Sequence, residues 1–194
     1  MFSVCSVVMP ANFEPRNTQK TRKKSEPKKV RDDTEQSGML VRRAKNDDAD
    51  RVAEFAMKLV EQHHEYDPER FALMASFDGM KWFYGEQADV KDAAVLVAEI
   101  ESRVVGFAYV TYEERNYAEL AESPAHLHDI YVEESARRSG AGESLIDAAG
   151  EVAKEFGASK LILSVAVKNA TGRNFFEKCG FRPTMTEMTL NLSQ

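Results

Sequence analysis

Cysteine is scarce in this sequence, with only Cys5 and Cys179 among 194 residues. The two lie far apart and one falls in a polar tail, so a disulfide framework is not expected, and a reducing, cytoplasmic setting fits. Two cysteines also exclude a zinc site made of cysteine pairs. The adjacent His63 and His64 point to different faces of a helix, and we therefore predict no metal site.

Long apolar runs are also missing. No segment approaches the ~18 consecutive apolar residues of a membrane-spanning helix, so no membrane association is expected. Hydrophobic residues make up 43% and charged residues 30% of the chain, which is the balance of an ordinary globular protein. The length suits one α/β domain with a core of its own and a tail.

Charge is unevenly spread along the chain. Residues 1–38 hold eight Lys or Arg and five acidic residues, so residues 39–194 carry −9 although the net charge is −6. The first segment lacks apolar periodicity, and we predict a disordered basic tail over 1–38 and one domain over 39–194. An acidic domain disfavours nucleic acid and favours cationic substrates, although the basic run at 20–31 leaves a nucleic-acid role open.

Apolar periodicity predicts the elements of the domain. Strands are expected at 40–44, 93–100, 104–112, 126–132, 160–167 and 186–192, and helices at 46–66, 140–156 and 169–179, with one or two short helices between 68 and 92. This order predicts a mixed sheet covered by helices, of the α/β class, with a central β–α–β unit at 126–167.

The stretch Arg137–Gly142 stands between a predicted strand and a predicted helix. Its two glycines allow close approach of the backbone to a ligand. The free N–H groups and positive dipole of the first helical turn suit a phosphate, and Arg137 and Arg138 add charge. We therefore predict a phosphate or pyrophosphate site here. A helix start that is merely capped by glycine is the alternative.

Two other phosphate-binding loops do not fit this stretch. A Walker loop needs Lys and then Ser or Thr after its last glycine, where this chain has Glu143 and Ser144. A dinucleotide fingerprint needs Gly or Ala where Leu145 stands.

Arg-x-x-Gly-x-Gly at Arg137–Gly142 resembles the coenzyme A loop of the GNAT superfamily of N-acetyltransferases. About 27 residues further on, Asn169–Phe181 resembles the second signature of that family, Asn-x-x-Ala-x-x-Phe/Leu-Tyr-x-x-x-Gly-Phe. The resemblance covers residues 40–192. It implies the GNAT acyltransferase fold, an α+β arrangement with a mostly antiparallel central sheet, a splayed coenzyme cleft and flanking helices.

The resemblance further implies acetyl-CoA as the co-substrate. Its pyrophosphate would lie on the loop, and its pantetheine arm would run along the strand at 126–132. The residues implied to bind it are Ile130, Val132, Arg137, Arg138, Ser139, Gly140, Ala141, Gly142, Asn169, Asn174 and Phe176.

Within the superfamily, Val105–Tyr109 and Leu127–Val132 look like the spermidine/spermine and diamine acetyltransferases. That branch has Glu where His128 stands, and a histidine can equally take a proton from the attacking amine. The family's Tyr, the acid for the leaving thiolate, is replaced by Phe176, and either water or a nearby tyrosine, with Tyr131 as the candidate, would substitute for it.

Strand alternation adds two expectations about the neighbours of this base. His126 should share a face with His128, and Asp129 should point to the other face and have a structural role.

The resemblance therefore implies an N-acetyltransferase that acts on a small primary amine, such as a polyamine, a diamine or an amino acid, and that forms a homodimer. Two alternatives stay open. One is acetylation of a protein or peptide amine, and the other is a CoA-binding sensor without turnover, which the loss of the Tyr favours.

Overall fold

The computed structural model describes residues 38–113 and 123–192, so almost all of the predicted basic tail lies outside the described residues. One five-stranded sheet forms the centre, and its strands follow each other in chain order. They are β1 (Met39–Arg43), β2 (Ala93–Ile100), β3 (Arg103–Tyr112), β4 (Ala125–Val132) and β5 (Leu161–Leu163). All neighbours are antiparallel except β4 and β5, which are parallel. The predicted mixed, mostly antiparallel sheet is confirmed.

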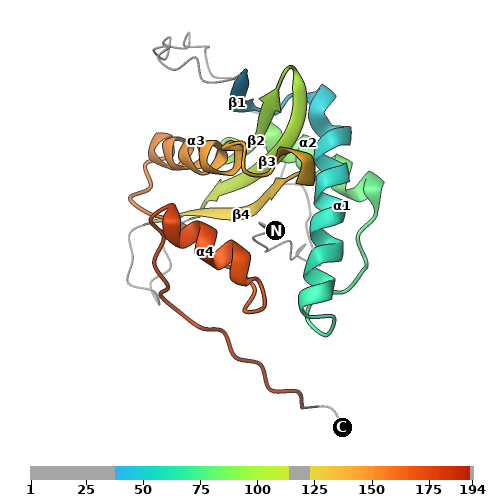
Figure 1. The fold of residues 1–194 in the computed structure, drawn as a ribbon, viewed down its shortest axis with the longest axis vertical. Coiled ribbons are helices and arrows are strands. Elements are labelled where there is room, and N and C mark those ends of the chain that lie inside the picture. The colour runs from blue at the N-terminus through green and yellow to red at the C-terminus, as the bar shows by residue number, and fades with distance from the viewer. Residues whose placement is uncertain (1–37, 114–122, 193–194) are drawn as a thin grey trace.

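Helices cover both faces of the sheet (Figure 1). The helices α1 (Ala49–Tyr66) and α2 (Phe77–Ala88) share one apolar cluster with the sheet, whereas α3 (Ala141–Glu155) and α4 (Ala170–Lys178) share the other. Short 3-10 turns, η1 (Asn46–Asp48) and η3 (Glu134–Ala136), precede α1 and α3. Within the described ranges, no helix is long and apolar enough to cross a membrane.

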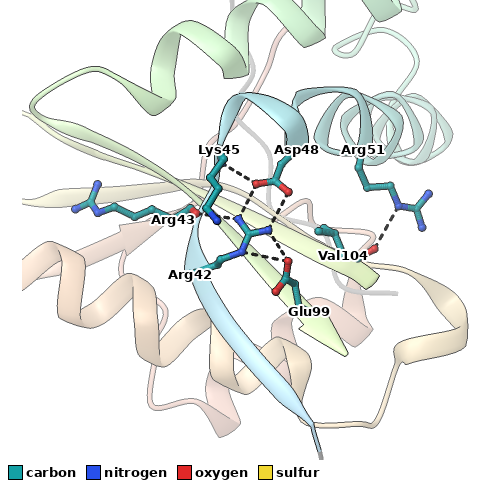
Figure 2. Close-up of polar contacts among 7 residues, drawn as sticks. All are labelled: Arg42, Arg43, Lys45, Asp48, Arg51, Glu99 and Val104. Carbon is teal, nitrogen blue, oxygen red and sulfur yellow. Dashed lines mark hydrogen bonds and ion pairs between the residues drawn. The ribbon is translucent and has the colours of Figure 1, made fainter. Parts of the chain in front are cut away.

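The start of the domain is fixed by one partly buried polar network (Figure 2). The guanidinium of Arg42 on β1 donates to both carboxylate oxygens of Asp48, at 2.6 and 3.0 Å, and its Nε donates to Glu99 of β2 at 3.1 Å. The backbone N–H of Lys45 also donates to Asp48, at 2.7 Å. These bonds, chiefly the one from Arg42, hold the pKa of Asp48 below its usual value. The network ties two strands to the entry of α1.

A bulge interrupts β4 at its middle. The register to β3 shifts after Tyr109 pairs with Asp129, because Val110 then pairs with Leu127 and His128 is left over. Leu127 and Ile130 both join the cluster under α3 and α4. Two residues between them, rather than one, therefore face the side of α1 and α2, as an inserted residue in a strand requires.

β4 and β5 stay together for only three residue pairs, from Ala125 with Leu161 to Leu127 with Leu163. The prediction of a strand over 160–167 was therefore too long. Beyond the bulge, β4 continues to Val132 without a strand partner on this side in the described part of the chain. The free edge creates a splay in the sheet, with backbone N–H and C=O groups available to a ligand.

The predicted strand at 186–192 is wrong. Residues 181–192 have no sheet partner among the described residues, and they run away from the sheet below α4 (Figure 1). The segment is held instead by side chains, because Arg70 binds Glu187 and Asn191 donates to Glu69 at 2.7 Å. A strand needs a neighbouring edge, which the local pattern of a sequence cannot supply.

Candidate active site

The loop that follows β4 has the backbone of an anion site. Arg138 and Gly140 adopt left-handed conformations, with φ of +65° and +91°, and Gly140 is the N-cap of α3. The Ser139 hydroxyl donates to the carbonyl of Ala136 at 2.7 Å and accepts a long bond from the N–H of Ala141 at 3.4 Å. The next N–H groups of the first turn have no intrahelical acceptor, and they carry the positive end of the helix dipole.

A cavity of about 340 Å³ opens beside this loop. It lies between the start of α3 and one face of α4, and it holds three cationic side chains, Arg137, Arg138 and Lys178. Its lining is Val132, Ala136, Arg137, Arg138, Gly142, Glu143, Thr171, Asn174, Phe175 and Lys178. Gly142 permits the two helices to approach, because a Cβ there would stand 3.0 Å from the Phe175 ring. Size, charge and free N–H groups fit a pyrophosphate.

His128 lies at the other end of the free strand edge, in the bulge. Its Nε2 is 2.6 Å from the hydroxyl of Thr111 and 3.6 Å from the carboxylate of Glu113, and its ring lies against Tyr109. Burial lowers the pKa of His128, and His126 adds to this while Glu113 opposes it. The imidazole is therefore held in its neutral form at pH 7, as a base requires.

Asp129 is fully buried and contacts the same layer as His128. Its Oδ2 accepts a hydrogen bond from the hydroxyl of Tyr84 on α2 at 3.0 Å, and Oδ1 has no partner among the described residues. Burial raises the pKa of Asp129 to about 7, against the opposing bond from Tyr84. The expectation that it points away from His128 is wrong, because the bulge breaks the alternation. His126 does lie beside His128, with ring centroids 5.9 Å apart.

Tyr131 packs between the strand and α1. Its ring lies 5.2 Å from Phe55, and 7% of its surface is exposed. Burial raises the pKa of its hydroxyl, and the charge of Arg137 in the loop opposes that rise. The hydroxyl thus lies within electrostatic reach of Arg137, which lines the cavity.

Comparison with known proteins decides what this arrangement is. The profile of the Acetyltransferase (GNAT) family matches residues 49–181, which include β4, the loop, α3 and α4. The chain belongs to the GNAT acetyltransferase family. The family is one of acetyltransferases.

Two relatives and one structure illustrate the likeness. An N-alpha-acetyltransferase of Sulfurisphaera tokodaii is 32% identical over 107 residues, which are 52% of this chain and 64% of that protein, so less than two thirds of that relative is matched. The uncharacterized N-acetyltransferase YhfO of Bacillus subtilis is 27% identical over 145 residues, 74% of this chain and 89% of that protein. The aminoglycoside N-acetyltransferase AAC(6')-Iy, solved with CoA, shares the fold with a TM-score of 0.65 at 16% identity, over 80% and 95% of the two chains.

Within this GNAT domain, the structure brings part of the predicted coenzyme set together. Val132, Arg137, Arg138, Gly142 and Asn174 line the cavity. Ser139, Gly140 and Ala141 shape the loop at its edge, and Ile130 is fully buried, so it can offer only its backbone.

Two predicted residues of α4 lie elsewhere. Asn169 is the N-cap of the helix, and its side chain accepts from the N–H of Gly172 at 2.8 Å. Phe176 is buried in the apolar cluster between Phe175 and Phe181 and does not line the cavity. Their contact with the coenzyme stays a prediction.

Sequence reasoning missed the working face of α4. Thr171, Phe175 and Lys178 line the cavity together with Asn174, and these positions follow the spacing of one helix face. The sequence carried a signal for this face, since the four residues recur at helical spacing and Lys178 adds a positive charge to it. Among the described residues, no group of three or more His, Cys, Asp or Glu side chains is placed to hold a metal ion.

Proposed function

We propose that this protein transfers the acetyl group of acetyl-CoA to a primary amine of a small molecule, such as a polyamine, a diamine or an amino acid. One observation carries the proposal. The cationic cavity and the neutral His128 lie at opposite ends of the same free edge of β4, so a ligand that lies along this edge reaches both.

The coenzyme is held at three levels of this edge. Its pyrophosphate accepts from the first N–H groups of α3, from Gly140 to Gly142, while Arg138 and Lys178 neutralise its charge. Its pantetheine amides pair with the backbone of Ile130 and Val132, as an added strand would. The thioester then ends near the bulge, where a backbone N–H polarises its carbonyl.

The reaction that follows is a direct transfer. The lone pair of the free amine attacks the thioester carbonyl, the C–N bond forms, and the C–S bond breaks with its electron pair on sulfur. His128 takes the proton of the amine, directly or through one water. The thiolate receives a proton from solvent or from Tyr131, because Phe176 cannot donate one. Holding both reactants on one strand supplies much of the rate enhancement.

The acceptor side suits a cation. Glu113 is a half-exposed carboxylate that lies 3.6 Å from both His126 and His128, and the domain as a whole is acidic. A carboxylate beside the base attracts an ammonium group, and the neutral histidine then accepts its proton. This supports a small cationic amine as the acceptor, which is what the likeness to the diamine branch implies.

The α-amino group of a protein is the second candidate acceptor. It is favoured by one specific observation, the name N-alpha-acetyltransferase of a relative that is 32% identical over 107 residues. We further propose that the protein is cytoplasmic and forms a homodimer, for which its GNAT membership is the support.

A panel of polyamines, diamines, amino acids and N-terminal peptides tests the proposal, with release of free CoA thiol as the readout. Thiol release with small diamines or amino acids, and little with peptides, is the expected result. Selective release with peptides supports the second candidate. Tight binding of acetyl-CoA, without release of CoA thiol in the presence of any amine, would mean that the protein is a coenzyme sensor without turnover.

A further inference from the structure

The histidine proposed as the base has a hydroxyl group bound to one of its two ring nitrogens. Nε2 of His128 lies 2.6 Å from the hydroxyl oxygen of Thr111 on β3. The two nitrogens of a neutral imidazole differ, because one carries the proton and the other the lone pair. A general base accepts a proton on its lone pair. Whether Thr111 donates or accepts in this bond therefore decides which nitrogen of His128 can take a proton.

The pairing of β3 with β4 brings Thr111 to this nitrogen. Thr111 is the cross-strand partner of His126, and the bulge leaves His128 as the unpaired residue of β4. His128 is thus a diagonal neighbour of Thr111, within reach of a long side chain. The rings of Tyr109 and His126 lie 5.2 and 5.9 Å from the His128 ring, at interplanar angles of 31° and 24°. These neighbours restrict rotation of the imidazole and keep Nε2 turned toward Thr111.

A carboxylate sets the direction of the bond. One oxygen of Glu113 lies 3.6 Å from Nε2 of His128, and the other lies 3.6 Å from Nε2 of His126. A lone pair on Nε2 would repel this negative charge, whereas an N–H group is attracted to it. The proton of His128 is therefore favoured on Nε2, and the Thr111 hydroxyl, which has lone pairs of its own, is the acceptor.

Two further ionisable groups near the ring are bound to α2. The hydroxyl of Tyr109 donates to Gln87 at 2.8 Å, and burial raises the pKa of that hydroxyl. Asp129, next to His128 in β4, accepts from the hydroxyl of Tyr84, and burial raises its pKa to about 7. Neither bond involves Nε2 of His128, so neither changes the direction of the bond to Thr111.

We infer that Thr111 is a positioning residue, which accepts a hydrogen bond from Nε2–H of His128 and so leaves Nδ1 as the atom that takes the proton of the amine. Within residues 38–113 and 123–192, no hydrogen bond to Nδ1 is found, so an amine or a bridging water can approach it. The inference rests on the proposed role of His128 as the base, and it adds the reacting atom and the residue that orients it.

The proton transfers balance with Thr111 unchanged. As the amine nitrogen bonds to the thioester carbon, the electron pair of the C–S bond goes to sulfur and the amine proton goes to Nδ1. His128 then carries N–H groups on both nitrogens. Nε2–H stays bound to Thr111 and faces the Glu113 carboxylate, which stabilises the imidazolium. Nδ1 later releases its proton to solvent.

NMR of the imidazole nitrogens tests the tautomer without an acceptor amine. The chain is labelled with ¹⁵N-histidine and studied with acetyl-CoA above neutral pH, and His128→Gln identifies the His128 signals among those of four histidines. The Nε2–H form is expected in the intact chain and in Thr111→Ser. Thr111→Val should increase the share of the Nδ1–H form, because an N–H that faces a methyl group has no acceptor. The Nδ1–H form in the intact chain overturns the inference, and so does a tautomer that Thr111→Val leaves unchanged.

Steady-state kinetics with the amine that releases most CoA thiol in the panel test the consequence for catalysis. Thr111→Val should lower kcat about 10- to 100-fold, the value of one hydrogen bond to a charged group, without changing KM for the amine or Kd for acetyl-CoA. The acid limb of the kcat profile should move to lower pH, because the imidazolium loses an acceptor. Thr111→Ser should restore kcat and the profile.

Tyr112→Phe is the matched control. It removes a hydroxyl from the next residue of β3, which packs against Phe156 on the other side of the sheet, and it should leave kcat unchanged. An unchanged kcat in Thr111→Val overturns the inference. A kcat as low in Thr111→Ser as in Thr111→Val does so too, because the shape of the side chain rather than its hydroxyl would then matter.

Failure of this inference differs from failure of the proposed function. If His128→Ala loses activity while Thr111→Val keeps it, the base stands and the positioning role of Thr111 alone is refuted. If His128→Ala keeps near-normal kcat, the proposed base is refuted, and the reacting atom assigned to it is refuted as well.

Discussion

The two ends of β4 contribute to the site by different means. At Val132–Gly142 the backbone forms most of the proposed anion site, through left-handed residues, free N–H groups and a helix dipole. At His128–Asp129 an extra residue in the strand turns two side chains to the same layer, one a neutral imidazole and one a fully buried carboxyl group. The first end depends mainly on backbone geometry, with cationic side chains beside it, while the second depends on the identity of each side chain.

Replacing His128, the proposed base, should give the largest difference between the two ends of β4. His128→Ala should lower kcat by roughly 10²–10⁴-fold, the range for one general base, with little change in acetyl-CoA affinity. His128→Glu should restore part of the activity. Because burial holds the pKa of His128 below its ordinary value, kcat of the intact enzyme should fall on the acid side with an apparent pKa below the ordinary histidine range. Near-normal kcat in His128→Ala, with an unaltered pH profile, would assign His128 to packing.

The backbone end is tested by adding charge to it. Gly140→Asp should raise the Kd of acetyl-CoA roughly 10- to 100-fold, because a carboxylate at the start of α3 repels the pyrophosphate and occupies its N–H donors. Gly140→Asn is the matched control, since Asn has the same size and also tolerates a positive φ. Equal affinities of the two variants in calorimetry would mean that no anion binds at this loop.

The sequence predicted these two ends unequally. Strand, loop and helix around Arg137–Gly142 are local, so the motif was enough to predict this local structure. The bulge depends on how Tyr109 and Val110 of β3 pair with β4, which no local pattern records, and the side of Asp129 was therefore predicted wrongly. Residues 186–192 have the alternation of a strand, but they have no sheet partner among the described residues, and a local pattern does not record whether a neighbouring edge is present.

The buried carboxyl under the bulge gives an effect that depends on pH. The pKa of Asp129 is raised to about 7 from an ordinary value near 3.9, so its stabilising, protonated form is complete below about pH 4 and is lost as the pH rises through 7. Asp129→Asn cannot ionise. It should gain stability over the native chain as the pH rises, by up to about 4 kcal/mol at pH 8.

Thermal unfolding between pH 4 and pH 8 measures this difference. Asp92→Asn, which removes an exposed carboxylate, serves as the control and should show no such trend. A difference for Asp129→Asn that stays constant with pH would mean that the carboxyl keeps its charge in the folded protein.

Asp48, next to the first strand of the sheet, gives a reference value for the size of these effects on stability. Asp48→Asn breaks charged bonds to Arg42 and should cost roughly 1.5–3 kcal/mol of stability without changing Kd or kcat. The pKa of Asp48 is lowered in the folded protein, so its contribution is present above pH 4 and is lost as the pH falls below that. Asp50→Asn, at an exposed ion pair nearby, should cost far less, and denaturant titration compares the two.

Gly142 of α3 and Phe175 of α4 both line the cavity, and they lie so close that a Cβ at Gly142 would stand 3.0 Å from the Phe175 ring. β5, the strand that leads into α4, is only three residues long, so α4 follows a short strand. A ligand that fills the cavity rests on both helices and binds the closed arrangement in preference to any in which α4 has opened. Acetyl-CoA at 100 times its Kd would therefore stabilise the closed form by about 2.7 kcal/mol. Hydrogen exchange of the α4 amides should therefore be slower with acetyl-CoA bound than without it. This difference can be measured before any acceptor amine is known.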